Sequence, residues 1–371
     1  MNVSDCSYVA KQYETSEQQE ANESRWPASA STNIELLIGP YRAGKTLNLV
    51  SQVIDHTRQN PFDEILVLVP SQRYQQLFEK RLAQALSAPV SNDEEQLKSG
   101  IFGLRIVNFY KLCQIILRRY GKPFKVVPEQ VRPAIISQVL TELSESGKIK
   151  GLSPIVNFTG TFQALLDLID EFERSALSST DVLARLEKTA QCDSKYMELA
   201  RIYDAYSRRL EELGFVDQKG LAFAAREALF DAAPSQWFGL VAVDGFDRFN
   251  ALQLHVLSGM ARHSRKLEIL FDYLPPQKDP ECEYAWKESS FNDLIRILGS
   301  KLRITEMTSR TPAEERLERA VKVSRFRAID RQFEMEEIAR RIKEKLVREK
   351  MRSDQFLVVV RDLKSYSALT A

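Results

Sequence analysis

The sequence predicts an α/β fold, built on a parallel β-sheet with a large all-helical insertion. Three observations support this prediction. Between residues 34 and 121, apolar strand patterns alternate with amphipathic helix patterns, which is the order that right-handed βαβ units produce. Between residues 128 and 230 only helical patterns occur. Strand patterns then return at 240–244 and 267–272, so the helical stretch is expected to be an insertion.

Length and charge are those of a globular protein with more than one domain. At 371 residues the chain exceeds what a single compact core accommodates, and two or three domains are expected. Lys and Arg number 52 and Asp and Glu number 51, so the net charge of +1 creates no overall field that would attract nucleic acid. A nucleic-acid site would therefore have to be a local patch.

The cysteines and the apolar runs exclude several other classes. The four cysteines are far apart and form no C-x-x-C pair, which disfavours a zinc site, an iron–sulfur cluster or a disulfide framework within the chain; they are Cys6, Cys113, Cys192 and Cys282. Free thiols in a cytosolic compartment are the plain interpretation, so a cytoplasmic location is expected. No apolar run is long enough to span a bilayer. Residues 1–31 are polar and are expected to be disordered.

The first strand pattern, residues 34–38, leads into a glycine turn and a helix that begins at Lys45. The turn fits G-x-x-x-x-G-K-[ST], the spacing of a phosphate-binding P-loop; its residues are Gly39, Pro40, Tyr41, Arg42, Ala43, Gly44, Lys45 and Thr46. Glycine lets backbone N–H groups approach phosphate oxygens, and the helix adds the positive end of its dipole. Lys45 is expected to neutralise the β- and γ-phosphates, and the Thr46 hydroxyl to hold Mg²⁺. ATP and Mg²⁺ are therefore the predicted cofactors.

The later elements follow in order along the chain. A continuous apolar run at 65–69 is typical of a parallel strand buried on both faces. The helix after it places Tyr74, Phe78 and Leu82 at helical spacing. The remaining patterns predict strands at 101–109, 321–328 and 356–361. They predict helices after 109 through Tyr120, at 155–177, at 193–213, around Leu294 and at 330–351.

The strand at 240–244 ends in Asp244, the second predicted residue of the nucleotide site. A P-loop needs an acidic residue at the end of another buried strand to hold the water shell of Mg²⁺, so Thr46 and Asp244 are the predicted metal-site residues. A helix N-cap is the alternative role for Asp244. Many P-loop ATPases follow this Asp with a Glu that orients the attacking water, but residue 245 is Gly, and nothing in the spacing requires Asp247 to replace the Glu. We expect ATP binding with impaired hydrolysis, slowed by roughly two to four powers of ten.

These motifs, in this order, resemble UvrD-like superfamily-one helicases, and more closely the B subunit of AddAB-type helicase/nucleases. Residues 38–46 match the first motif of that family, and residues 243–253 match the second with its trailing glutamine. Residues 66–82 are similar to the strand and helix that touch single-stranded DNA. Residues 107–121 resemble the segment "TFHSFC…ILRRYG", with Asn108 and Tyr110 replacing Thr and His. The Asp-Gly-Phe at 244–246, within the second motif, resembles the B subunit rather than the motor.

The resemblance implies a RecA-like P-loop NTPase sheet, a helical insertion beside a DNA path, and the start of a second α/β domain in the N-terminal part of a larger protein. The expected organisation is a disordered segment at 1–31, a first RecA-like domain in two parts at 32–122 and 237–274, a helical insertion at 123–236, connecting helices and a linker at 275–320, and the start of a second RecA-like domain at 321–371.

The resemblance also implies partners, namely single-stranded or end-unwound DNA and an AddA-type motor/nuclease subunit, with no membrane. The candidate DNA contacts are Ser71, Gln72, Arg73, Asn108, Tyr110, Arg118 and Arg119. Phosphates favour basic and short polar groups, and unstacked bases favour aromatic faces such as that of Tyr110. A solvated helix end is the alternative interpretation of the two neighbouring arginines. Arg327 is a candidate for approaching the γ-phosphate from the second domain, with a charged strand end as the alternative.

The expected function is that of a helicase-like N-terminal region of an AddB-type subunit, which acts in double-strand break processing and recombinational repair. Two alternatives stay open. One is an active ATP-dependent DNA helicase of the UvrD-like class, whose catalytic acid comes from elsewhere in the chain. The other is a scaffold that binds DNA and its partner without needing nucleotide. A small-molecule P-loop kinase is a more distant alternative, because the long helical insertion has no place in it.

Overall fold

The computed structural model describes residues 33–87, 101–121, 124–188, 194–217, 220–279, 282–299, 302–308, 324–362 and 365–366. It divides into two compact units, residues 1–310 and 311–371. The predicted disorder of residues 1–31 lies outside the described residues, as do Cys6 and Cys192. Cys113 and Cys282 are free thiols, as expected. None of the helices in the described ranges combines the length and the apolar character that crossing a membrane requires.

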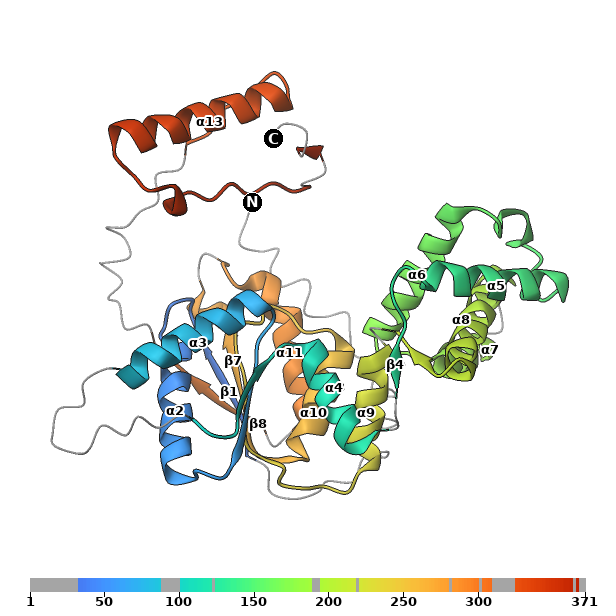
Figure 1. Cartoon of the computed structure of the whole chain (residues 1–371), viewed down its shortest axis with the longest axis horizontal. Coiled ribbons are helices and arrows are strands. Elements are labelled where there is room, and N and C mark those ends of the chain that lie inside the picture. Colours follow the sequence, from blue (N-terminus) through green and yellow to red (C-terminus); the bar gives the residue numbers. More distant parts are fainter. Residues whose placement is uncertain are drawn as a thin grey trace. The chain divides into compact units, whose positions relative to one another are not determined.

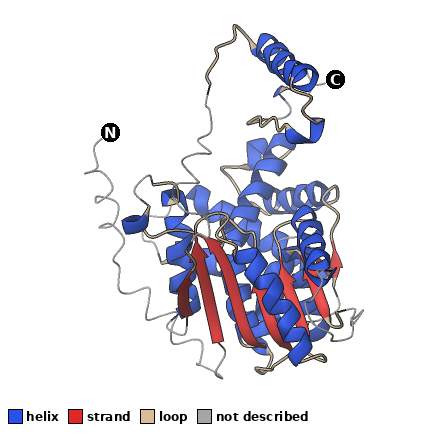
Figure 2. Cartoon of the chain, turned by 90° about the vertical axis from the view of Figure 1, so that its left-hand side faces the viewer, coloured by secondary structure: helices blue, strands red, loops and turns tan. Residues whose placement is uncertain are grey.

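The first unit contains a six-stranded sheet whose neighbouring strands are all parallel (Figure 2). The order across the sheet is β3-β2-β6-β7-β1-β8. The strands are β1 (Asn33–Gly39), β2 (Glu64–Leu68), β3 (Leu104–Val107), β6 (Phe238–Val243), β7 (Ser264–Asp272) and β8 (Leu302–Glu306). The parallel sheet predicted from the strand–helix alternation is confirmed, and the strands at 65–69, 240–244 and 267–272 form where predicted.

Helices cover both faces of this sheet, because its strands alternate their side chains between two apolar layers (Figure 1). Leu37 packs with α2 (Lys45–Gln59) and α3 (Gln72–Ser87) on one face. Its neighbour Leu36 packs in the other layer with the remaining helices of the sheet domain. These are α4 (Phe109–Tyr120), α9 (Gly220–Asp231), α10 (Ala251–Ala261) and α11 (Glu288–Leu298). Burial on both faces explains why the central strands have continuous apolar sequences.

A helical cluster with its own apolar core lies beside the sheet domain (Figure 1). It consists of α5 (Arg132–Glu145), α6 (Thr159–Arg174), α7 (Ser179–Glu187) and α8 (Ser194–Glu212). Tyr203 and Tyr206 of α8 lie in this core, whereas Tyr196 of the same helix is 57% exposed and Phe158, before α6, is 63% exposed. Helix α9, which falls inside the predicted insertion at 123–236, packs with α4 and α10 over the sheet instead.

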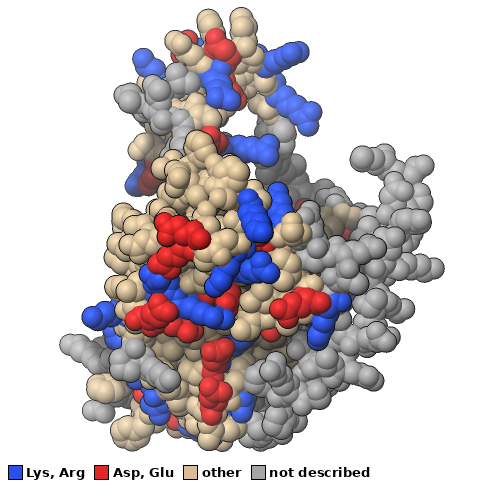
Figure 3. Space-filling model, turned by 90° about the vertical axis from the view of Figure 1, so that its right-hand side faces the viewer, with Lys and Arg blue, Asp and Glu red and all other residues tan. Residues whose placement is uncertain are grey.

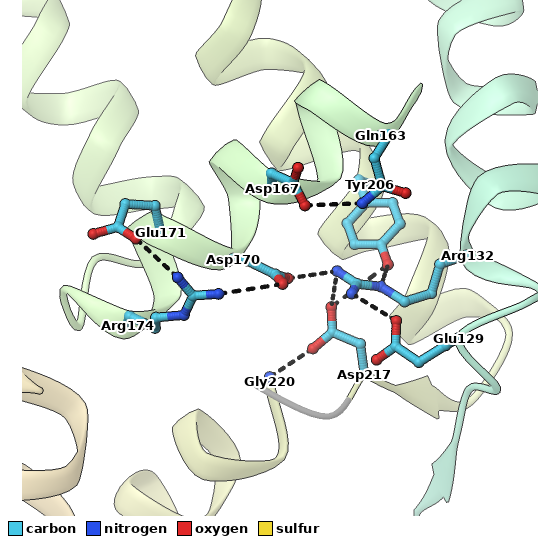
Figure 4. Close-up of polar contacts among 10 residues, drawn as sticks. All are labelled: Glu129, Arg132, Gln163, Asp167, Asp170, Glu171, Arg174, Tyr206, Asp217 and Gly220. Atoms are coloured by element: carbon cyan, nitrogen blue, oxygen red, sulfur yellow. Dashed lines mark hydrogen bonds and ion pairs between the residues drawn. The ribbon is translucent and has the colours of Figure 1, made fainter. Parts of the chain in front are cut away.

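A buried arginine joins three segments of the helical cluster (Figure 4). The Arg132 side chain is 3% exposed, and its guanidinium pairs with Asp170 at 2.8 Å, Asp217 at 3.3 Å and Glu129 at 3.2 Å. Its Nε donates to the hydroxyl of Tyr206 at 3.0 Å. Burial alone would lower the pKa of Arg132, but the Tyr206 hydrogen bond and the nearby carboxylates raise it above its ordinary value. Arg132 therefore stays charged and links α5 to α6 and α8.

Three strands were not predicted from the sequence. The stretch from 128 to 230 is not entirely helical, because β5 (Phe215–Val216) pairs with β4 (Lys125–Val126) in a two-stranded sheet. The linker predicted at 275–320 contains β8, which pairs with β1 at the sheet edge. Four short 3₁₀ turns complete the described structure, namely η3 (Ser153–Ile155), η4 (Pro276–Lys278), η5 (Ala285–Lys287) and η7 (Ser353–Gln355).

The second unit contains one long helix and no strand within its described residues. Helix α13 (Arg331–Arg348) forms as predicted and begins at Asp330, whose side chain accepts from the backbone N–H of Phe333 at 2.9 Å. The predicted strands at 321–328 and 356–361 are wrong wherever the structure describes them. Leu357 is 83% exposed and Val359 is 81% exposed. An apolar run becomes a buried strand only where neighbouring strands pair with it, and no such neighbour is among the described residues.

Candidate nucleotide-binding site

The candidate site lies at the carboxyl edge of the main sheet. Because neighbouring strands are parallel, the residues that end β1, β6 and β7 meet at one edge, where open α/β sheets bind ligands. Gly39 ends β1 and is directly opposite Asp272, the last residue of β7. Asp244 follows β6, and its backbone N–H donates to Leu68 O of β2 at 3.0 Å. The fold thus brings the predicted P-loop and Asp244 to the same edge.

The backbone of the loop requires glycine at its two ends. Gly44 has φ 93° and precedes α2, which begins at Lys45 as predicted. A Cβ on Gly39 would lie 2.5 Å from the carbonyl oxygen of Met307, so the neighbouring chain leaves no room for a side chain. Between them, the Ala43 N–H donates to Pro40 O at 3.1 Å and closes a turn. The first N–H groups of α2 have no partner within their own helix and are available to an anion.

Lys45 is buried and fully engaged with groups of the protein. Its side-chain ammonium donates to Gly39 O at 2.9 Å and to Pro40 O at 2.7 Å. It also forms an ion pair with Asp272 Oδ1 at 2.7 Å, and the Lys45 side chain is 6% exposed. An ammonium has three N–H donors, and these three acceptors match that number.

Thr46 and Asp244, the predicted metal-site residues, lie at the same edge of the sheet, one in the first turn of α2 and the other directly after β6. Burial raises the pKa of Asp244 above its ordinary value; the nearby Thr46 side chain partly opposes this, and the negative charge of Asp272 adds to it. Two carboxylates, those of Asp244 and Asp272, therefore stand close to the predicted P-loop.

Gly245 lies beneath an aromatic ring, which no local pattern in the sequence indicates. It has φ 82°, and a Cβ at this position would be 2.7 Å from Cε1 of Tyr74. Tyr74 belongs to α3 and is 43% exposed. Burial raises the pKa of Tyr74, as do the charges of Asp247, Asp244 and Asp272, so its ring stands among the acidic groups of the site. At the position where many P-loop ATPases carry Glu, a side chain would have to displace the Tyr74 ring and adopt a left-handed backbone conformation.

Two more residues reach the site from the segment after β7. The Tyr41 N–H in the loop donates to the hydroxyl of Tyr284 at 2.8 Å. Asp247 forms an ion pair with Lys287 at 2.6 Å, so its carboxylate is held by a lysine of η5.

Asp272, Tyr74 and Tyr284 were not identified from the sequence as residues of the site. Asp272 ends a strand that the sequence predicted, and an acidic residue at that position could have indicated its place in the site. Tyr74 and Tyr284 gave no such signal, because their proximity to the loop arises only from the fold.

The predicted DNA contacts separate into two groups. Ser71, Gln72 and Arg73 are exposed at the start of α3, directly after β2. Asn108 and Tyr110 follow the neighbouring strand β3 at the same edge of the sheet. The Asn108 side chain accepts from the backbone N–H of Lys111 at 2.9 Å and caps α4, so it has a structural role there.

Arg118 and Arg119 lie away from the first group, at the far end of α4. There they line a hollow with Glu64 and Trp237, residues at the amino ends of β2 and β6. The guanidinium of Arg119 stacks over the Trp237 ring at 4.5 Å. Basic and acidic side chains are interspersed on the face of the molecule drawn in Figure 3. Arg327 is exposed in the second unit, before α13, and its role stays a prediction.

Comparison with known proteins assigns the chain to a family. A family model described as "ADDB, N-terminal" matches residues 36–324. The chain is 23% identical to the B subunit of the ATP-dependent helicase/deoxyribonuclease of Exiguobacterium sibiricum over 358 residues, which cover 89% of this chain and 30% of that protein. It is 24% identical to the protein of the same name from Bacillus velezensis over 282 residues, which cover 72% of this chain and 22% of that protein.

The chain thus spans less than a third of the length of these relatives. The family model covers more than half of the chain, including the predicted phosphate-binding loop from Gly39 to Thr46 and Asp244. On this evidence the chain belongs to the AddB N-terminal family.

Proposed function

We propose that this chain is the helicase-like N-terminal region of an AddB-type subunit, which acts in a helicase/nuclease complex during double-strand break processing and recombinational repair. Residues 39–46 bind the phosphates of ATP in this proposal, and Thr46 and Asp244 hold Mg²⁺. The names of the relatives support a complex of this kind. The main support for the nucleotide site is that the parallel sheet brings the loop, with its left-handed Gly44 before α2, and Asp244 to the same edge.

The residues of the site fit ATP and Mg²⁺ by their chemistry. Gly39 and Gly44 give the loop its close backbone approach, and α2 directs its N-terminal N–H groups toward the bound phosphates. In the described part of the chain, no group of three or more His, Cys, Asp or Glu is arranged to hold a metal ion. Mg²⁺ in nucleotide sites takes one or two protein ligands and completes its shell with phosphate and water, so the Thr46–Asp244 pair suits it. The bound ion would neutralise phosphate charge.

Slow hydrolysis is the second part of the proposal. The side chain that would orient an attacking water is missing at Gly245, and the Tyr74 ring occupies the space where it would begin. Asp247, the nearest alternative acid in the sequence, is paired with Lys287. These contacts support a subunit that binds ATP and turns it over poorly.

DNA binding is proposed at the same edge of the sheet. Ser71, Gln72 and Arg73 offer short polar and basic groups for phosphates, and Tyr110 offers an aromatic face for a base. An AddA-type motor/nuclease is the proposed protein partner. Arg118 and Arg119 lie at the opposite end of α4, with Glu64 and Trp237, so the proposed DNA contacts at this edge do not include them.

The test measures ATP·Mg²⁺ binding and turnover, with and without single-stranded DNA, on this chain and on a chain extended to the length of its relatives. We expect binding with slow turnover, and loss of binding in Lys45→Ala. Lys278→Ala, which removes an exposed lysine paired with Glu306, is the matched control. Fast DNA-stimulated hydrolysis that Lys45→Ala abolishes would favour the active-helicase alternative. Absence of binding in both chains would favour the scaffold alternative.

A further inference from the structure

The phosphate loop is occupied by the protein's own groups. Lys45, the cation that the proposed function assigns to the phosphates, is bound to Asp272 and to two loop carbonyls. The Tyr41 N–H, which belongs to the same loop, is bound to the Tyr284 hydroxyl. An anion that enters the loop must therefore compete with an oxygen of Asp272 for the ammonium, and with the Tyr284 hydroxyl for a backbone donor.

Asp272 is fixed in this position by the sheet. It is the last residue of β7 and lies in register with Gly39, the first residue of the loop. The next residue, Tyr273, donates its backbone N–H to Gly39 O at 3.1 Å, so the chain is held against the loop on both sides of the Asp272 side chain. The Asp272 side chain is 30% exposed and the Lys45 side chain only 6%, so the ion pair is shielded on the lysine side.

Tyr284 is positioned independently of Asp272. Asp279 is buried, and its carboxylate accepts from the backbone N–H groups of Glu283 at 3.0 Å and Tyr284 at 2.8 Å. Tyr284 itself is 8% exposed. Asp272, at the end of β7, and Tyr284, in the segment after β7, thus both contact the loop that follows β1.

We propose that Asp272 is an affinity-setting residue of the nucleotide site, which holds Lys45 away from phosphate until a nucleotide displaces it, with Tyr284 acting in the same direction on the loop backbone. This inference rests on the proposed nucleotide-binding function. It predicts that removing the Asp272 charge strengthens nucleotide binding. If Asp272 had only a structural role, the same substitution would weaken nucleotide binding, because it would damage the loop. Asp272 and Asp244 also place two negative charges beside the loop, which adds repulsion toward an incoming polyphosphate.

The first measurement examines the ion pair without nucleotide. The chain is treated with an amine-acylating ester, and the modification of Lys45 is followed by peptide mass spectrometry. Asp272→Asn keeps the shape of the side chain and removes its charge, so we expect Lys45 to be acylated several-fold faster than in the wild type. Glu306→Gln is the matched control, because Glu306 also ends a strand that flanks β1 and is paired with a different lysine, Lys278. Equal rates of Lys45 acylation in the wild type and Asp272→Asn would overturn the inference.

The second measurement is the affinity for ADP and ATP with Mg²⁺, by calorimetric titration. We expect Asp272→Asn to lower the Kd by about tenfold, the order expected when one charge-assisted hydrogen bond no longer has to be broken. Tyr284→Phe should lower it by a smaller factor, and Asp272→Ser serves if Asp272→Asn does not fold. Glu306→Gln should leave the Kd unchanged.

The outcomes separate this inference from the function on which it rests. Wild-type binding that Asp272→Asn leaves unchanged or weakens would overturn the inference and leave the nucleotide function standing. Absence of binding in both proteins, with Lys45 more reactive in Asp272→Asn, would overturn the nucleotide function and with it this inference.

Discussion

The buried Arg132 allows a quantitative prediction for the helical cluster. Arg132→Met keeps an unbranched apolar stem and removes the guanidinium. The side chains of Asp217 and Asp170 are 0% and 9% exposed, so both carboxylates would stay buried after losing this cation (Figure 4). Removing one partner of a buried ion pair costs about 3–5 kcal/mol. We expect Arg132→Met to destabilise the helical cluster by that amount.

Hydrogen exchange followed by mass spectrometry can measure this loss locally. A loss of about 3 kcal/mol lowers the protection of amides in α5, α6 and α8 by about a hundredfold, where exchange requires the cluster to open. Arg208→Ala is the control, because Arg208 is 70% exposed and its pair with Asp204 lies on the same cluster. Exposed pairs contribute about 0–1 kcal/mol.

A double variant tests the physical cause. Adding Asp170→Asn to Arg132→Met removes one of the two charges left behind and should restore part of the lost protection. An Arg132→Met variant that loses no more amide protection than Arg208→Ala would refute the reasoning, because burial of the two carboxylates would then not require the charge of Arg132. An Asp170→Asn addition that only worsens the loss would show that packing, rather than charge, is responsible.

Two further predictions follow from the sheet domain. Gly245→Glu should lower the melting temperature and should not increase ATP turnover. A side chain in the left-handed backbone conformation costs roughly 1–2 kcal/mol, and the Tyr74 ring occupies the space that it would need. A gain in DNA-stimulated turnover would contradict this prediction. Burial lowers the pKa of His263 below its usual 6.5, and its ring contacts Leu229 O at 2.8 Å and Ser235 Oγ at 3.0 Å. The neutral ring therefore contributes stability that is full above about pH 6.5 and is lost as the pH falls through the lower folded-state pKa. As the pH is lowered from 7.5 to 5, the urea midpoint of unfolding should fall more steeply in the wild type than in His263→Gln. Equal slopes in the two proteins would contradict this role of His263.

The central strands were predictable because burial on both faces leaves a continuous apolar sequence. The runs at 65–69 and 240–244 have this form and became β2 and β6. The edge strand β8 gave little signal, because it is only five residues long, none of its residues is buried, and only Leu302 and Ile304 are apolar. The opposite error occurred at 356–361, where an apolar run has no described neighbour to pair with. Strand formation depends on partners, which a local pattern does not reveal.

The candidate site divides in the same way between local and distant information. The loop from Gly39 to Thr46 is a local motif, so its turn and the helix after it could be predicted from spacing alone. Asp244 could be predicted because it ends a recognisable strand. The Tyr74 ring over Gly245 and the Tyr284 hydroxyl on Tyr41 could not, because each joins residues that only the folded sheet brings together.

The contacts that could not be predicted bear most directly on what the site does. A loop with Lys45, Thr46 and Asp244 is compatible with both a motor and a binding subunit. Tyr74 acts on the position where hydrolysis would be assisted, whereas Asp272 acts on the cation that would bind the phosphates. The two contacts come from different elements, α3 and β7, and one concerns turnover while the other concerns affinity. Asp272→Asn changes the contact that concerns affinity, and Gly245→Glu changes the contact that concerns turnover. If the chain is a binding subunit, Asp272→Asn should bind ATP more tightly without hydrolysing it faster. An active motor carries no such requirement.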